Sequence, residues 1–194
     1  LAVWGAEIIS SPGSEGSNGA MRRAQALAAE NPDWFFPYQY ANPANPQAHY
    51  ESTGPEIWQD CPEITHFVGG LGTGGTLMGV GRYLKEQNPD VQVWAVEPPA
   101  GEKVDGLKSL DEGFVPPVFV EGGGYDLLDR KRIVGTRDSI LGVRRLADAG
   151  VFAGISSGAI FAAACKCASE IASGTVVAIV CDGGWKYLSS DVWT

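Results

Sequence analysis

The sequence predicts an α/β protein with a mostly parallel sheet flanked by helices. Three observations support this class. Short apolar runs alternate with segments of helical periodicity between residues 64 and 181. Glycine-rich turns connect several of these segments. In addition, 44% of the 194 residues are hydrophobic, which is enough to fill the core that such a sheet requires.

The expected elements follow in chain order. Ala6 to Ile9 is a short strand candidate, and Ser17-Asn18 is expected to cap a helix that ends at Asn31-Pro32. Residues 34–40 are aromatic and are expected to be extended. Further along, we expect strands at 64–68, 91–96 and 176–181, helices at 76–87, 139–148 and 159–173, and loops with short helices at 98–124.

The proline-rich run Asn42 to Pro46 marks a boundary between two structural units. Its prolines fix φ, and its asparagines tolerate turn geometry. We therefore divide the chain into residues 1–41 and 42–194. Parallel strands place their carboxyl ends at one edge of the sheet, so ligands are expected at that edge.

Charge and composition exclude several classes of partner. The 14 basic and 23 acidic residues give a net charge of −9 without a basic stripe, so we expect no nucleic acid partner. No apolar stretch of about 18 residues and no leader pattern occur, which favours a cytoplasmic protein with no membrane contact. The four cysteines lack disulfide-framework spacing and lie apart from both histidines, so no metal site is expected.

The segment Gly69 to Thr76 is the main candidate binding site, because a strand is expected to end there and a helix to begin. Backbone N–H groups and the helix dipole can then meet an anion. Glycines allow close backbone approach, and Thr73 and Thr76 supply hydroxyl donors. The segment therefore predicts a phosphate site. A nucleoside triphosphate is disfavoured because no Lys-Ser or Lys-Thr follows the glycines.

A dinucleotide is an alternative ligand for the same loop. Gly70, Gly72 and Gly75 fit the Rossmann spacing, and Glu97 ends the next expected strand at about the distance where an acid meets a ribose hydroxyl. The local sequence does not separate NAD from a cofactor with a single phosphate.

Two further elements lie at the same expected edge of the sheet. Ser156 and Ser157 stand at the start of an expected helix, where a hydroxyl either caps the helix or binds a ligand. Asp182 follows the last expected strand and precedes a tight turn, which it either stabilises or uses to face a ligand.

Taken in order, six segments resemble the cysteine synthase family of pyridoxal-phosphate enzymes: Gln39-Tyr40, Asn42 to Pro46, Thr53-Gly54-Pro55-Glu56, Gly72 to Thr76, Gly154 to Gly158, and Lys186-Tyr187-Leu188-Ser189. The ordered set is far more specific than the loop alone, and it displaces the NAD interpretation. The resemblance implies a tryptophan-synthase β-subunit-like fold, known as fold type II. Leu1 to Ala41 would then be a remnant of the smaller N-terminal domain, and Asn42 to Thr194 most of the larger one.

The resemblance also implies roles for single residues. Ser156 corresponds to the hydroxyl that hydrogen-bonds the pyridine nitrogen of pyridoxal 5'-phosphate, and Gln39 to an amide that helps to hold the substrate carboxylate. A neutral hydroxyl does not force protonation of the ring, which favours β-elimination over transamination. The phosphate cradle corresponds to Gly72, Thr73, Gly74, Gly75 and Thr76.

The reaction implied is β-replacement in cysteine biosynthesis. An activated serine, O-acetylserine or O-phosphoserine, loses its leaving group, and sulfide or a sulfur carrier adds. Residues 111–116 and 181–187 are most similar to second-type synthases, including some that take O-phosphoserine. Lys108 stands where those enzymes keep an arginine, which implies substrate binding without the bidentate fork. The family also implies a homodimer for the full-length protein.

The Schiff-base lysine of the family has no counterpart in this sequence. In the family it lies in an Asn-rich context followed closely by Arg. We therefore expect a C-terminal fragment that carries no catalytic residue and is inactive alone. The alternative is a non-catalytic cofactor-binding or regulatory partner. None of the lysines has the family context: Lys85, Lys103, Lys108, Lys131, Lys166 and Lys186.

Overall fold

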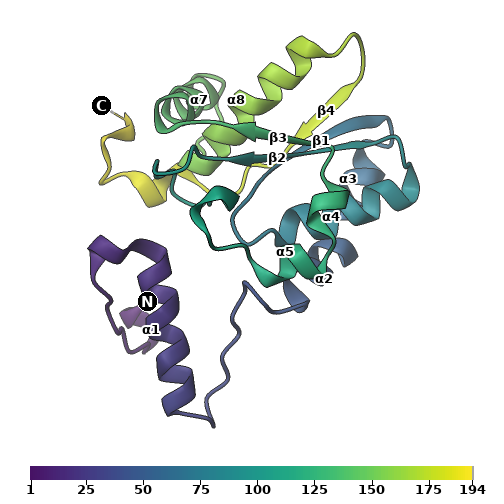
Figure 1. Cartoon of the computed structure of the whole chain (residues 1–194). Coiled ribbons are helices and arrows are strands. Elements are labelled where there is room, and N and C mark those ends of the chain that lie inside the picture. Colours follow the sequence, from purple (N-terminus) through teal and green to yellow (C-terminus); the bar gives the residue numbers. More distant parts are fainter. Residues whose placement is uncertain (194) are drawn as a thin grey trace. The chain divides into compact units, whose positions relative to one another are not determined.

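The computed structural model describes residues 1–193, and Figure 1 shows their elements. The chain forms two compact units, Leu1–Tyr38 and the unit that begins at Gln39. This division falls shortly before the boundary expected after Ala41.

The first unit contains one long helix. The helix α1 spans Gly16–Glu30 and follows two short 3-10 turns, η1 at Ala2–Trp4 and η2 at Gly13–Glu15. It ends where the sequence predicted, but Ser17 and Asn18 lie inside it and do not cap it. The expected strand at residues 6–9 is wrong, because this apolar run is exposed and forms no strand pairing. Residues 34–40, which were expected to be extended, contain no helix or strand.

The second unit is built on a four-stranded sheet, and the predicted α/β class is confirmed. The strands are β1 (Ile64–Gly70), β2 (Gln92–Glu97), β3 (Arg130–Ile133) and β4 (Thr175–Ala178). Their order is β3-β2-β1-β4, and every pairing is parallel. β3 was not predicted, because its sequence Arg-Lys-Arg-Ile has the charge typical of an edge strand rather than an apolar run.

Helices cover both faces of the sheet, as Figure 1 shows. One face packs against α7 (Thr136–Asp148) and α8 (Ile155–Glu170), where Val68 and Val96 are buried. The opposite face packs against α4 (Gly75–Gln87), where Phe67 and Val93 are buried. Both faces of the central strands are therefore buried, as expected for a parallel sheet.

Two helices before β1 were not predicted. α2 spans Ala44–Glu51 and α3 spans Thr53–Asp60. α2 begins inside the proline-rich run, because a proline is compatible with the first turn of a helix. The middle of the chain forms short helices, as predicted: η3 (Leu110–Glu112), α5 (Pro117–Glu121) and α6 (Gly124–Leu127). The short turns η4 (Gly184–Tyr187) and η5 (Asp191–Trp193) follow β4.

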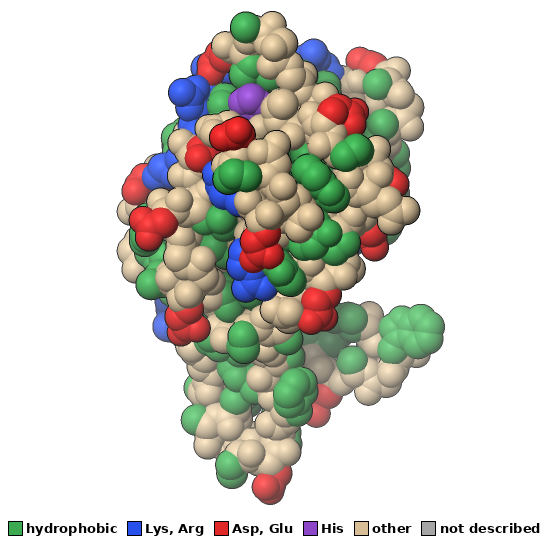
Figure 2. Space-filling model, turned by 90° about the vertical axis from the view of Figure 1, so that its right-hand side faces the viewer, with side chains coloured by type: hydrophobic (Ala, Val, Ile, Leu, Met, Phe, Trp, Pro, Cys, Tyr) green, Lys and Arg blue, Asp and Glu red, His purple; other side chains and the backbone are tan. Residues whose placement is uncertain are grey.

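Four general properties of the described residues concern possible partners: surface charge, apolar helices, metal-binding groups and cysteine pairing. On the face drawn in Figure 2, basic side chains are interspersed with acidic ones and form no continuous stripe. Within residues 1–193, no helix is long and apolar enough to cross a membrane, and no group of three or more His, Cys, Asp or Glu side chains is placed to hold a metal ion. The four cysteines are unpaired.

Candidate cofactor site

The glycine-rich loop lies between β1 and α4, at the carboxyl edge of the sheet. Leu71 continues the sheet by donating its N–H to Val96 O at 2.8 Å. Gly74 has a φ of 89°, a conformation that glycine adopts without strain, and it lets the chain turn into α4. The N–H groups of Gly72, Thr73 and Gly74 find no acceptor in the part of the chain that the structure describes. Unpaired amides at a helix N-terminus suit an anion.

Helix α2 supports this loop from behind through Asn45. The Nδ2 of Asn45 donates to Thr73 Oγ1 at 2.9 Å, and the same oxygen accepts the N–H of Gly75 at 3.2 Å. A side chain at Gly75 would overlap the Asn45 amide. Asn45 was missed from the sequence as a site residue, although it belongs to the proline-rich run that was noted as a boundary.

A second contact from α2 holds the hydroxyl of Thr76. The Nε2 of His49 lies 3.1 Å from Thr76 Oγ1, and its Nδ1 lies 2.9 Å from Thr53 Oγ1. Burial lowers the pKa of His49, so the neutral ring is favoured. A neutral imidazole has one donor and one acceptor nitrogen, which suits two hydroxyl partners.

Gly106 brings the loop and Ser156 together. A Cβ on Gly72 would lie 2.8 Å from the carbonyl oxygen of Gly106. A Cβ on Gly106 would lie 3.3 Å from Ser156 Oγ, and Gly106 itself has a φ of 91°. The backbone at Gly106 is therefore close to both the glycine-rich loop, at Gly72, and the start of α8, at Ser156. The sequence offered only its place in the glycine-rich middle stretch as a signal for this role.

Ser156 is in the first turn of α8 and is 4% exposed. It is not the N-cap, because that position belongs to Gly154. The neighbouring Ser157 has a structural role, since its Oγ accepts the N–H of Cys181 at 2.9 Å. Ser156 therefore does not cap α8, and its hydroxyl lies close to Gly106 and to the thiol of Cys181.

The two residues predicted to bind substrate have different surroundings. Lys108 donates its N–H to Leu71 O at 2.7 Å, beside the loop. Its ammonium lies 5.4 Å from the ring centroid of Tyr40 and 5.6 Å from that of Phe114. Burial lowers the pKa of Lys108. Gln39 is exposed in a turn, and its carbonyl oxygen accepts a hydrogen bond from Asn45 Nδ2 at 2.9 Å.

Glu97 ends β2 as expected but does not face a ligand. Its side chain is fully buried. Its Oε2 accepts the N–H of Leu110 at 2.9 Å, and its Oε1 lies 2.7 Å from the Nζ of Lys131. Both oxygens are thus occupied by the chain itself, which argues against the role of a ribose acid in a dinucleotide site.

Asp182 stabilises the turn after β4, the structural alternative considered for it. The Tyr187 hydroxyl donates to Asp182 Oδ2 at 3.0 Å, and Gly154 donates its N–H to Asp182 O at 2.9 Å. Burial and the hydrogen bond to Asp182 raise the pKa of Tyr187 to about 12. Asp182 therefore connects the last turn to the start of α8.

The parallel sheet, the glycine-rich loop at its carboxyl edge and the buried serine on the opposite helix are arranged as in fold type II pyridoxal-phosphate enzymes. The chain belongs to the family of pyridoxal-phosphate dependent enzymes, whose sequence profile matches residues 1–182. The cofactor of this family is pyridoxal phosphate. The unpaired amides of Gly72, Thr73 and Gly74 fit its phosphate.

Individual relatives agree with the resemblance to cysteine synthases, which is confirmed. The chain is 41% identical to cysteine synthase B of Pseudomonas aeruginosa, over 100% of this chain and 64% of that protein. It resembles the crystal structure of an O-acetylserine dependent cystathionine beta-synthase from Helicobacter pylori, with a TM-score of 0.89 and 35% identity over 100% of this chain and 65% of that one. It also resembles a cysteine synthase from Entamoeba histolytica, with a TM-score of 0.87 and 31% identity over 99% and 59%. The chain thus spans 64% of the length of its curated cysteine synthase relative.

Proposed function

We propose that the protein to which this chain belongs makes cysteine by pyridoxal-phosphate-dependent β-replacement on an activated serine. The observation that carries the proposal is the row of unpaired amides from Gly72 to Gly74 at the start of α4, with the hydroxyls of Thr73 and Thr76 held by α2. This arrangement suits one phosphate group, and the family supplies the cofactor that bears it.

The side chains of the site have distinct roles in this proposal. The cofactor, when bound, supplies the electron sink for elimination of the β-leaving group. Gly72, Thr73, Gly74, Gly75 and Thr76 hold its phosphate. Ser156 hydrogen-bonds the pyridine nitrogen without protonating it, because a serine hydroxyl has no acidic proton to give at neutral pH. Gly106 keeps the space between the cradle and Ser156 free of side-chain atoms.

Substrate choice is assigned to Lys108 and Gln39. Lys108 lies beside the loop, and its ammonium offers a positive charge to the phosphate of O-phosphoserine. Gln39 offers its amide to the substrate carboxylate. O-acetylserine needs no such charge at its leaving group, so Lys108→Ala in the full-length enzyme should reduce kcat/KM for O-phosphoserine much more than for O-acetylserine. Equal losses for both substrates would remove Lys108 from this role.

The proposal includes a setting for the whole protein. We place it in the cytoplasm as a homodimer, with the unit Leu1–Tyr38 as part of the smaller domain and the unit from Gln39 as most of the larger one. Four unpaired cysteines are typical of a reducing compartment. The size of the protein in sedimentation velocity would test the dimer.

A second candidate function is a cofactor-binding partner without catalysis. It is favoured by the ion pairs of several lysines, since a protonated, paired amine is a poor nucleophile. The Nζ of Lys85 lies 2.7 Å from Asp129 Oδ2, and that of Lys131 lies 2.7 Å from Glu97 Oε1. A chain of this kind would bind pyridoxal phosphate non-covalently.

One experiment tests the function of the 194-residue chain. The purified chain is mixed with pyridoxal phosphate, O-acetylserine or O-phosphoserine, and sulfide, and cysteine is assayed. We expect cofactor binding without turnover, because a positioned acid–base group alone is worth about 10² to 10⁴ in rate. Turnover near that of an intact synthase would show that one of the six lysines serves as the Schiff-base residue. Unchanged cofactor binding by Gly74→Asp would remove the cradle from the proposal.

A further inference from the structure

A cavity lies apart from the cofactor cradle, in a groove between β3, α7 and α8. Its volume is about 580 Å³, within the range of small-molecule sites. We call it the β3 groove. Its lining comprises Lys131, Arg132, Ile133, Val134, Asp138, Leu141, Gly142, Arg145, Ala162, Ala163 and Lys166. None of these residues belongs to the cradle or to the positions assigned to substrate.

The charge of the β3 groove is opposite to that of the chain. The chain carries a net charge of −9, yet the groove is lined by four basic side chains and one acidic side chain, Asp138. Basic residues gathered in a concave site on an acidic protein raise the local concentration of anions.

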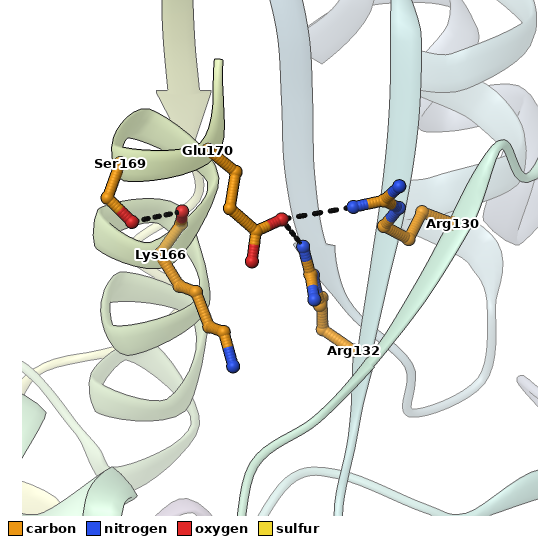
Figure 3. Close-up of polar contacts among 5 residues, drawn as sticks. All are labelled: Arg130, Arg132, Lys166, Ser169 and Glu170. Atoms are coloured by element: carbon orange, nitrogen blue, oxygen red, sulfur yellow. Dashed lines mark hydrogen bonds and ion pairs between the residues drawn. The ribbon is translucent and has the colours of Figure 1, made fainter.

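Two of the four basic side chains are fixed by carboxylates. Lys131 pairs with Glu97, and this hydrogen bond raises the pKa of Lys131. Arg132 pairs with Glu170, which also binds Arg130 at 3.0 Å. Figure 3 shows Glu170 reaching from α8 to both arginines. The Nε of Arg132 is buried and finds no hydrogen-bond acceptor within residues 1–193.

The other two basic side chains form no ion pair with a carboxylate within the described residues. Arg145 on α7 contacts the ring of Phe161, at 5.2 Å from its centroid, and forms no ion pair there. Lys166 on α8 extends apart from the ion pair of Glu170, as Figure 3 shows. The two side chains line the groove from different helices.

The rest of the lining is apolar. Ile133, Val134 and Leu141 contribute branched side chains, and Ala162 and Ala163 contribute small ones. Gly142 permits close packing of α7 on α8, because a Cβ there would overlap the carbonyl group of Gly158. This mixture suits a ligand with an anionic group and an apolar body, since inorganic anions gain nothing from apolar walls.

We propose that the β3 groove binds a small organic anion, a carboxylate or phosphate monoester with an apolar body, through Arg145 and Lys166. Guanidinium and ammonium groups form charge-assisted hydrogen bonds with both kinds of anion. The lining shares no residue with the cradle, so a ligand in the groove would not compete directly with the cofactor.

The test is a titration of the ¹⁵N-labelled chain with benzoate, phenyl phosphate and neutral benzyl alcohol, followed by amide chemical shifts. We expect both anions to shift the amides of residues 131–134, 138–145 and 162–166, and benzyl alcohol to bind at least about tenfold more weakly. Shifts confined to residues 72–76 with phenyl phosphate would mean that only the cradle binds it. That result, or no shift with either anion, would overturn the proposal.

Variants that remove single charges test whether Arg145 and Lys166 bind the anion. Arg145→Gln with Lys166→Gln should weaken benzoate binding at least about tenfold. The matched control replaces Arg137, which is exposed on α7 outside the groove, together with the exposed Lys103, both by Gln, and it should bind like the parent chain. Far-UV circular dichroism checks that each variant is folded. If the double variant is unfolded, the binding test is made with the single variants Arg145→Gln and Lys166→Gln. Equal Kd values for parent, groove variants and control would refute the roles of Arg145 and Lys166.

Discussion

Asn45 donates a hydrogen bond from its side-chain amide to the hydroxyl oxygen of Thr73, at 2.9 Å. The same amide nitrogen donates to the carbonyl oxygen of Gln39, at 2.9 Å. One side chain of α2 thereby fixes a hydroxyl of the cradle and the backbone of a residue assigned to the substrate. The contact joins two segments 28 residues apart, which the sequence had assigned to different roles.

The first prediction concerns this contact. Asn45→Ala should weaken binding of pyridoxal phosphate about three- to tenfold, because one neutral hydrogen bond contributes about 0.5–1.5 kcal/mol. Cofactor fluorescence or ³¹P NMR measures the affinity. The matched control is Asn88→Ala, at the other end of α4, where the side chain accepts the N–H of Asp90 at 3.0 Å. Similar losses in both variants would mean that Asn45 acts through general stability and not through Thr73.

The second prediction concerns the close approach of two backbone segments. Gly72→Ala should destabilise the chain by about 1–3 kcal/mol, because the new Cβ would lie 2.8 Å from Gly106 O and one segment must move. Cofactor affinity should fall as well, since both segments border the site. Gly13→Ala is the control, because no atom lies within 4 Å of its Cβ. Chemical denaturation measures both variants, and an unchanged midpoint for Gly72→Ala would contradict the close packing.

The third prediction compares how much a buried and an exposed carboxylate, both paired with Lys131, contribute to the free energy of unfolding. Glu97→Gln should cost about 1–3 kcal/mol, because the buried amide cannot replace both the ion pair and the hydrogen bond from Leu110. Asp111→Asn should cost less than about 0.5 kcal/mol, because Asp111 pairs with the same ammonium at 3.3 Å while 65% exposed. Urea unfolding compares them. If Asp111→Asn lost more stability than Glu97→Gln, then Asp111 and not Glu97 would be the main partner that stabilises Lys131 in β3.

Several elements could be predicted because their local pattern and tertiary role agree. The apolar run of β1, the glycines after it and the periodic α4 all indicated a strand, a turn and a helix, and the structure has these elements. The phosphate cradle between them stays a prediction. β3 could not be found, because an edge strand needs few apolar residues. Residues 6–9 failed in the opposite way, since an apolar run does not form a strand without a partner.

The site residues that were missed act through tertiary contacts. Asn45 and His49 support the cradle from a helix that begins in a proline-rich run, and nothing in that run indicates what its side chains will meet. Gly106 is one of several glycines in a stretch without regular periodicity. Its role depends on two segments that come close only in the folded chain, those of Gly72 and Ser156.

The last prediction is that stability falls as the pH is lowered through the range where histidine titrates. Burial lowers the pKa of His49 below its ordinary value of 6.5, so the folded chain favours the neutral ring. As the pH falls through 6.5, the unfolded chain binds a proton on His49 before the folded chain does. The free energy of unfolding therefore decreases in this range, and the contribution is fully present only above 6.5.

His49→Gln should remove part of this decrease. His66 also has its pKa lowered by burial, so His66→Gln should remove another part, and the double variant should remove both. Carboxylate titrations are common to all variants and cancel in the comparison. The free energy of unfolding is measured by urea denaturation at about pH 7.5 and about pH 5.5, on either side of the ordinary histidine pKa. Only His49→Gln should also change the affinity for pyridoxal phosphate, because only His49 contacts Thr76. If His49→Gln kept the full pH dependence of the parent chain, the ring of His49 would be as easily protonated in the folded state as in the unfolded one, and the lowered pKa would not explain the loss of stability at low pH.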